Sequence, residues 1–307
     1  MIDPGGLRAL VAVGRTGSVA AASELLGYTP SAVSQQVKRL ERDLGAPLLE
    51  RRGRGVLLTE RGRALAAEGR SVLDGLERLE SLAVADDRAV PLRIASFSTA
   101  TRGLVAGVLG DLAGGDRATA STVTSVDPFD AMAMVDDGRA DLAVVHDWNS
   151  VPLAAPAGVA VEHLCWDEAD VVLAAGHPLA ATDELDRHAL VGEAWASTPR
   201  GAICHEALQR IFSDLGTVPR IVAEDPDFAS LVVLARTGVA IALVPRLGRA
   251  PLPDGAVARP LADHSQVRQV RVAYRSSRAD RPALRRAVEL LQAAGAAATT
   301  GAAAPDR

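Results

Sequence analysis

The stretch of sequence that decides the fold of the N-terminal part is residues 18–44, SVAAASELLGYTPSAVSQQVKRLERDL. It contains two short helical patterns, which Gly27 and Tyr28 separate. The first pattern begins at Ser18, a residue type that caps helix N-termini well, and its apolar residues share one helical face: Val19, Ala22, Leu25 and Leu26. Glycine then ends this helix. The stretch predicts a helix-turn-helix.

The second helix begins at Thr29, which can cap it. Pro30 suits its first turn, because an N–H at this position would have no hydrogen-bond partner within the helix and proline lacks one. Its apolar residues recur every three or four positions and predict a buried stripe of Val33, Val37, Leu40 and Leu44. The opposite face is then exposed and carries Ser31, Ser34, Gln35, Lys38 and Arg42. Hydroxyl and amide groups can read base edges, and the cations can contact phosphates. We expect this helix to enter the major groove of DNA.

Residues 47–58 contain two short apolar stretches, and between them lies a run of arginines interrupted by glycines. This is the pattern of a β-hairpin. The arginines near its tip can reach phosphates or the minor groove beside the main site: Arg51, Arg52 and Arg54. Helical periodicity alone would equally fit a hairpin of helices in an unrelated domain. The basic β-hairpin favours a winged helix-turn-helix.

The charge of the chain is divided unevenly along its length. The formal net charge is −5, but residues 1–64 hold ten basic and six acidic residues, so they carry +4 and the remainder carries −9. We therefore expect any contact with DNA to be confined to the first 64 residues.

Neither a membrane span nor a secretory signal is visible in the sequence. No uninterrupted apolar stretch reaches the roughly 18 residues that cross a bilayer, and residues 1–4 lack the basic and apolar segments of a signal peptide. These features predict a cytoplasmic protein without a membrane partner.

A long helix is expected from Thr59, its cap, to about Ala85. Small and apolar residues repeat along it at alternating spacings of four and three: Leu65, Gly69, Val72, Leu76, Leu79 and Ala83. This spacing is typical of a coiled-coil seam, although a helix packed on its own domain shows a similar pattern.

At this point the sequence resembles the LysR-type transcriptional regulators. The resemblance rests on residues 17–22 (GSVAAA), 29–34 (TPSAVS), 39–41 (RLE), 44–51 (LGAPLLER) and 57–62 (LLTERG). It implies that Thr29, Pro30, Ser31, Ser34 and Gln35 lie at the DNA, and we add Ser18, Lys38 and the three arginines of the wing. The family often has a basic residue in place of Gln35 and a phenylalanine in place of Leu49.

The resemblance also favours dimerisation through the long helix, by Leu65, Val72, Leu76 and Leu79. A dimer presents two recognition helices, so we expect it to bind an interrupted inverted repeat in double-stranded DNA. Many members of the family pair further into dimers of dimers, and RNA polymerase is another candidate partner.

From residue 92 the pattern changes to short apolar runs that alternate with helices, at 92–95, 140–145, 170–174, 238–244 and 270–274. Such runs predict parallel-rich sheets in an α/β domain. The resemblance continues here through residues 92–95 (LRIA), 138–144 (GRADLAV), 176–179 (GHPL) and 238–245 (GVAIALVP). It implies the bilobed fold of a periplasmic binding protein, with an effector cleft between the lobes.

The expected fold class is therefore α/β with an N-terminal all-α winged helix-turn-helix. We place the DNA-binding domain at residues 1–58, the linker and dimerisation helix at 59–86, the effector-binding domain at 87–295 and a disordered tail at 296–307. Lobe one comprises about 91–162 and 269–295, and lobe two about 163–268.

The leading effector position is Ser98 and Thr99, after the first strand and at the start of an expected helix. Free N–H groups and two hydroxyls there can bind a carboxylate or similar anion, although an ordinary helix cap has the same appearance. In the family, the position of Thr99 carries a hydroxyl that contacts the effector. Strand ends and loops add Ser96, Asp127, His146, Thr198, Arg200 and Asp225. The expected ligand is a small anionic metabolite, with no cofactor or metal.

Three other functions compete with this one. An enzyme is disfavoured because the sequence has no phosphate loop, dinucleotide glycine pattern, HExxH or GxSxG. A cysteine-based redox sensor remains the main alternative, since some family members use two cysteines, but Cys165 and Cys204 follow apolar stretches and packing is their expected role. A molybdate-type sensor fits the bilobed strand pattern poorly.

Overall fold

The computed structural model describes residues 2–52, 55–83, 90–114, 118–262 and 266–298. The chain divides into two compact units, unit 1 at residues 1–85 and unit 2 at residues 86–307. Residues 84–89, which include the boundary expected between the linker helix and the effector-binding domain, and most of the tail expected at 296–307 lie outside the described residues.

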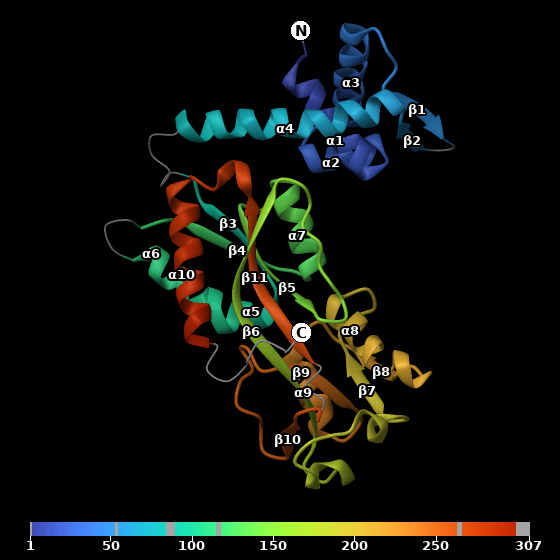
Figure 1. Cartoon of the computed structure of the whole chain (residues 1–307), viewed down its shortest axis with the longest axis vertical. Helices are drawn as coiled ribbons and strands as arrows, with labels where there is room; N and C mark the ends of the chain where they lie inside the picture. The colour runs from blue at the N-terminus through green and yellow to red at the C-terminus, as the bar shows by residue number, and fades with distance from the viewer. Residues whose placement is uncertain (1, 53–54, 84–89, 115–117, 263–265, 299–307) are drawn as a thin grey trace. The chain divides into compact units, whose positions relative to one another are not determined.

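Unit 1 consists of helices and one β-hairpin (Figure 1). Its elements are α1 (Pro4–Thr16), α2 (Val19–Leu26), α3 (Pro30–Leu44), β1 (Leu49–Arg52), β2 (Gly55–Leu58) and α4 (Glu60–Ala83). Ser18 Oγ accepts the N–H of Ala21 at 3.0 Å, and Thr29 Oγ1 accepts the N–H of Ala32 at 3.2 Å, so the two expected caps are present. β1 and β2 pair antiparallel. The predicted winged helix-turn-helix is confirmed.

The core of unit 1 joins the first three helices to the hairpin. Val33, Val37 and Leu40 are buried with residues of α1 and α2, while Glu41 Oε1 accepts the N–H groups of Leu48 and Leu49 and fixes the start of the wing on α3. Leu44 was wrongly assigned to the buried stripe, because it is 39% exposed. It is the last residue of α3, and the chain turns away there through Gly45 at φ +64°.

The helix α4 packs on its own unit along its N-terminal turns. Leu65 lies against the core of unit 1, and a Cβ at Gly69 would come within 2.5 Å of Leu7 Cδ1 of α1. Further along the same expected seam, Val72 is 56% and Leu79 63% exposed. Glycine at 69 thus allows α1 and α4 to approach closely, and Val72 and Leu79 keep their side chains outside the core.

Unit 2 is an α/β unit built on one extended sheet, with strand order β4-β3-β5-β11-β6-β9-β7-β8 and β10 on β6. The strands are β3 (Leu92–Ser96), β4 (Ser121–Ser125), β5 (Leu142–Trp148), β6 (Val159–Ala174), β7 (Ala194–Ser197), β8 (Arg220–Glu224), β9 (Ile241–Pro245), β10 (Ala256–Arg259) and β11 (Val267–Arg275).

The helices of unit 2 cover both faces of this sheet (Figure 1). They are α5 (Ser98–Ala100), the π-helical η2 (Thr101–Val105), α6 (Ala106–Ala113), α7 (Pro128–Asp136), α8 (Ile203–Ile211), α9 (Phe228–Arg236) and α10 (Pro282–Ala298). Short 3₁₀ turns are η3 (Pro178–Ala181), η4 (Arg187–Leu190), η5 (Ser213–Leu215) and η6 (Ser276–Arg278).

The expected parallel-rich sheet is instead mixed. β3 pairs parallel with β4 and β5, and β7 pairs parallel with β8 and β9. The long strand β6 and the returning strand β11 pair antiparallel with each other, and β6 also pairs antiparallel with β9 and β11 with β5. A buried apolar run does not reveal its direction in the sheet, so the sequence pattern could not distinguish the two cases.

Alternating side chains of these strands enter different cores. On one face a single core runs through the whole sheet and includes residues of α7 and α8. On the other face β3, β5, β11 and the start of β6 pack on α6 and α10, and this part is called the first half of unit 2. The end of β6, β7 and β9 pack on α9 and form the second half. The two halves of unit 2 therefore share one core and keep another of their own, which places the ends of β3, β5 and β7 near the junction of the halves.

The C-terminal segment differs from the expectation. The alanine-rich end after Gln292 was expected to be disordered from residue 296, but α10 continues to Ala298. Leu291 is buried and Gly295 lies close to the backbone of Leu164 on β6, so packing on the sheet extends this helix. Alanine also has the highest intrinsic helix propensity.

Candidate functional site

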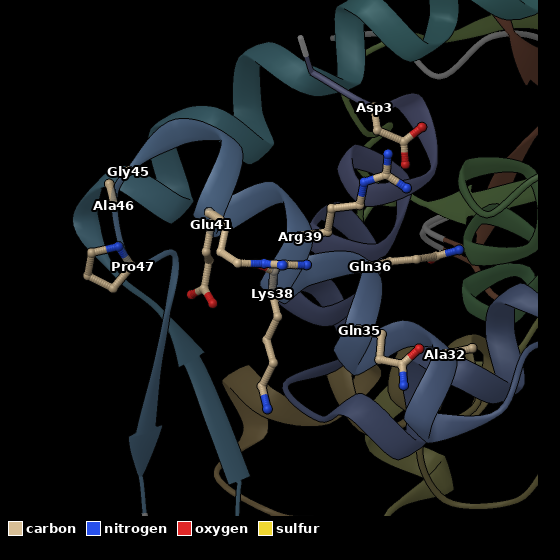
Figure 2. A pocket seen from close by; sticks show the side chains of 11 residues that line it. Asp3, Ala32, Gln35, Gln36, Lys38, Arg39, Glu41, Gly45, Ala46 and Pro47 are labelled. Carbon is tan, nitrogen blue, oxygen red and sulfur yellow. The ribbon is translucent and has the colours of Figure 1, made fainter.

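The exposed side of α3 is the candidate DNA-binding surface of unit 1. Thr29, Pro30, Ser31, Gln35 and Lys38 are exposed and Ser34 is half-buried, opposite the buried stripe of the same helix. Figure 2 shows Gln35 and Lys38 on the side of α3 that borders an open groove of about 950 Å³. The sequence pattern and the observed burial agree on which face of α3 is free.

The groove beside α3 contains one cation that sequence reasoning did not assign to DNA, Arg39. Arg39 and Arg42 line it with Lys38, while the acids in its wall are already engaged: Asp3 Oδ2 caps α1 at Gly6 N, and Glu41 holds the start of the wing. The spacing 35, 38, 39 and 42 covers one helical face, and this spacing is the signal that could have identified Arg39.

The wing presents part of its predicted basic tip. Arg51 is exposed on β1. The side chain of Arg52 and the whole of Arg54 lie outside the described residues. Ser18 is half-buried at the start of α2, and its hydroxyl oxygen is occupied as a cap.

Unit 2 contains a cavity of about 460 Å³, a volume in the usual range for small-molecule sites. Five of the eight predicted effector residues line it: Ser98, Asp127, His146, Thr198 and Arg200. They come from the ends of β3 and β5, the start of α7 and the loop between β7 and α8. The fold brings these distant segments together at the junction of the two halves.

Arg268 on β11 is the central charged residue of the cavity wall, and sequence reasoning missed it. Its side chain is fully buried, Nε and Nη2 each lie 2.8 Å from Asp167 Oδ2, and Nη2 also donates to Thr99 Oγ1 at 2.7 Å. The rings of Phe97 and Trp148 lie 4.9 and 5.8 Å from its guanidinium carbon. Asp167 also accepts the N–H of Leu247, so this ion pair is locked in place. The sequence signal was weak, because Arg268 is one of three arginines in the strand VRQVRVAYR.

His146 lies at the end of β5 and is nearly fully buried. Burial and the neighbouring Arg268 and Arg271 hold its pKa well below the usual range, so the ring is neutral. Its Nε2 lies 3.8 Å from Cys204 Sγ, and its ring packs edge-on against Phe97. Within the part of the chain that the structure describes, its Nδ1 and the hydroxyl of Thr198 have no hydrogen-bond partner.

Asp127 connects the two halves at the cavity wall. Its Oδ1 accepts the N–H of Phe129 at the start of α7, and its Oδ2 accepts the N–H of Ile203 at the start of α8. Burial raises the pKa of Asp127, against the two backbone hydrogen bonds that lower it. The positive ends of both helices compensate its charge.

The other three predicted effector residues lie outside the lining of this cavity. Ser96 is fully buried, and its hydroxyl donates to the carbonyl oxygen of Phe97. Asp225 accepts the N–H of Asp227, which caps α9. Thr99 is buried, holds Arg268 and borders a second, more apolar pocket of about 270 Å³ beside α9. Thr99 therefore reaches the cavity only through Arg268.

The two cysteines are free, and burial raises the pKa of each thiol to about 11. A thiol with so high a pKa forms little of the reactive thiolate. Among the described residues no group of three or more His, Cys, Asp or Glu is placed to hold a metal ion. None of the described helices has the length and hydropathy needed to span a membrane.

Comparison with known proteins agrees with this architecture. Residues 5–63 match the family model "Bacterial regulatory helix-turn-helix protein, lysR family", and residues 85–296 match the "LysR substrate binding domain". The chain is 31% identical over 263 residues to the small neutral protease regulatory protein of Streptomyces coelicolor, covering 84% of this chain and 81% of the relative. It is 32% identical over 272 residues to the regulator AbaB of Streptomyces antibioticus, covering 82% and 84%.

Solved structures share the fold of the whole chain. A full-length OxyR variant from Pseudomonas aeruginosa superimposes with a TM-score of 0.65 at 20% identity, covering 96% of this chain and 95% of that one. Full-length BenM gives 0.59 at 21% identity, covering 99% and 100%. The winged helix-turn-helix, the α/β unit that follows it in the sequence and these matches lead to one conclusion: the chain belongs to the LysR family of DNA-binding transcriptional regulators, which carry an effector-binding domain and are not enzymes.

Proposed function

We propose that this regulator reads double-stranded DNA through the exposed face of α3 and senses a small molecule in the 460 Å³ cavity of unit 2. The observation that carries the proposal is the convergence of five predicted effector residues on that one cavity. Buried polar groups without partners are costly unless a ligand or water satisfies them. The cavity gathers several such groups, which supports a binding role.

On the DNA side, Gln35 and Ser31 are the proposed base-reading residues, and Lys38, Arg39, Arg42 and Arg51 the proposed phosphate contacts. Amides and hydroxyls on an exposed recognition helix can pair with base edges in the major groove, whereas long cations reach the backbone. Val72 and Leu79 on α4 supply exposed apolar surface for a homodimer. A dimer would read an interrupted inverted repeat, and dimers of dimers, RNA polymerase contacts and a cytoplasmic location complete the proposal.

The effector would act through the junction of the two halves of unit 2. Phe97 and His146 lie at the strand ends of the first half, and Thr198 and Phe228 belong to the second. A ligand touching both halves shifts their relative arrangement only if it binds one arrangement more tightly than the other. Ligand binding in the cavity is therefore expected to change the affinity for the operator or the spacing of half-sites.

Capture of genomic DNA fragments by the purified full-length protein at moderate salt tests the proposal. The expected result is an enriched interrupted inverted repeat. Small molecules that raise the melting temperature of the protein are then added to the captured operator, and they should shift its affinity or its footprint. Retention of DNA without any shared motif, or ligand binding that leaves both operator affinity and footprint unchanged, would refute the corresponding half of the proposal.

A further inference from the structure

Three polar atoms in the wall of the unit 2 cavity carry information about its ligand. Arg268 Nη1, His146 Nδ1 and Thr198 Oγ1 are buried and have no hydrogen-bond partner among the described residues. Arg268 is 0% exposed, His146 1% and Thr198 7%. Since Nε and Nη2 of Arg268 are engaged by Asp167 and Thr99, Nη1 is the guanidinium nitrogen left for a ligand.

The charges around the cavity limit the charge of that ligand. Asp167 pairs with Arg268, and two helix N-termini compensate Asp127. Arg200 and Asp130, the remaining charged residues of the lining, are exposed, where water screens them, and they have opposite signs. Arg268 is therefore the one deeply buried cationic donor in the described lining. Because Asp167 already pairs with it and Asp127 adds a second carboxylate, a ligand with one anionic group fits this lining better than a dianion.

Much of the rest of the lining consists of apolar rings. Phe97 and Phe228 are nearly buried, Phe129 is partly exposed, and three prolines complete the wall: Pro128, Pro199 and Pro226. Aromatic and proline rings pack well against a planar apolar body. Guanidinium hydrogen bonds to a carboxylate are about twice as strong as neutral ones.

We propose that the effector is an aryl monocarboxylate whose carboxylate accepts a hydrogen bond from Arg268 Nη1, with Thr198 and His146 completing its contacts. This inference rests on the proposed function, because it assigns a ligand class to the same cavity. It makes Arg268 the anion-recognition residue and Thr99 a positioning residue that holds Nη2. The sequence-based expectation of a direct contact with Thr99 is thereby replaced by an indirect one.

The experiment measures binding of matched probes to the full-length protein by calorimetry. Phenylacetate and 3-phenylpropionate are compared with their amides, phenylacetamide and 3-phenylpropionamide, and with the dianion phenylmalonate. At least one carboxylate is expected to bind tenfold or more tightly than its amide and more tightly than phenylmalonate. Equal binding of acid and amide, tighter binding of the dianion, or no binding of either carboxylate would overturn the inference.

A conservative variant locates the interaction. Arg268→Lys keeps the positive charge beside Asp167 but has one ammonium in place of the guanidinium nitrogens, so it should lose at least tenfold of the preference for carboxylate over amide. The matched control is Arg271→Lys on the same strand, since Arg271 pairs with Asp147 and does not line the cavity. Unchanged preference in Arg268→Lys, or equal loss in both variants, contradicts the assignment.

Capture of operator DNA by the protein distinguishes failure of this inference from failure of the proposed function. Wild type and the control variant Arg271→Lys should both retain operator DNA without ligand, because Arg271 lies in unit 2 and outside the cavity lining. If wild type binds the operator and responds only to neutral compounds, the proposed function stands and the ligand class is wrong. If wild type retains no specific DNA, the proposed function itself fails. Should Arg268→Lys not fold, Thr198→Val provides the second variant, which is expected to weaken carboxylate binding severalfold.

Discussion

Arg268 Nη2 donates to Thr99 Oγ1 across 2.7 Å, and neither side chain is more than 1% exposed. The bond joins β11 to the start of α5, two segments that lie far apart in the sequence. With the ion pair to Asp167, it fixes the guanidinium in the wall of the ligand cavity. Thr99, which the sequence predicted to contact the effector, thus orients Arg268. We propose that Arg268 makes the contact instead.

Thr99→Val should weaken both the fold and the ligand site. Valine has the shape of threonine without the acceptor, so a buried guanidinium N–H loses one partner at a cost of about 1–3 kcal/mol. Urea unfolding of wild type and variant measures this cost. Carboxylate affinity should fall while operator binding without ligand is kept. A variant with unchanged stability and unchanged ligand affinity would show that the bond to Arg268 is unimportant.

Arg51→Ala should weaken binding to every DNA sequence by a similar factor. Arg51 is exposed on β1 and is proposed to contact phosphate, a contact that carries no base information. The slope of log affinity against log salt should become shallower by about one unit. Fluorescence anisotropy across a salt series checks this. A loss confined to the operator would instead make Arg51 a base-reading residue.

Val72→Ser combined with Leu79→Ser should dissociate the dimer without unfolding unit 1. Both side chains are more than half exposed on α4, so their removal leaves the described core unchanged. Sedimentation should show a shift from dimer to monomer and a loss of operator affinity. The matched control is Leu65→Ser, which removes a side chain packed on the core and should lower the melting temperature. Dimers that persist at low concentration in the double variant would rule out this surface.

The stability of unit 2 should depend on pH through His146. The folded-state pKa of this residue is lowered well below 6.5 by burial and two arginines, so below pH 6.5 the unfolded state binds more protons than the folded one. The free energy of unfolding that the neutral His146 ring contributes is fully present above pH 6.5. It is lost as the pH falls below that value, at up to about 1.4 kcal/mol per pH unit. His146→Gln should flatten the fall in melting temperature between pH 7 and 5. Parallel curves for the two proteins would contradict a buried neutral histidine.

The sequence predicted unit 1 more completely than the ligand site. Caps, periodicity and glycine positions are local signals, and they identified α2, α3 and the wing, with Leu44 misplaced because it ends its helix. In unit 2 the apolar runs located strands, but their directions depend on chain crossings that no local pattern records.

Within the ligand cavity, too, local signals predicted some residues and could not predict those that depend on long-range contacts. Ser98 and Thr198 follow strands and His146 lies near the C-terminal end of β5, so a rule about strand ends could find them. Arg268 sits inside a strand, and its role depends on Asp167 and Thr99, which only the fold brings close. Long-range ion pairs of this kind are invisible to spacing rules.

The ratio of operator affinity to random-DNA affinity, measured for wild type and Gln35→Ala at one salt concentration, tests most directly whether α3 reads DNA sequence. Gln35 is exposed in the middle of the free face of α3 and can pair with a base edge. A lost base contact should lower the ratio roughly five- to a hundredfold, with little change in random-DNA affinity. An equal loss on both DNAs, or no loss on either, would contradict sequence reading by this helix.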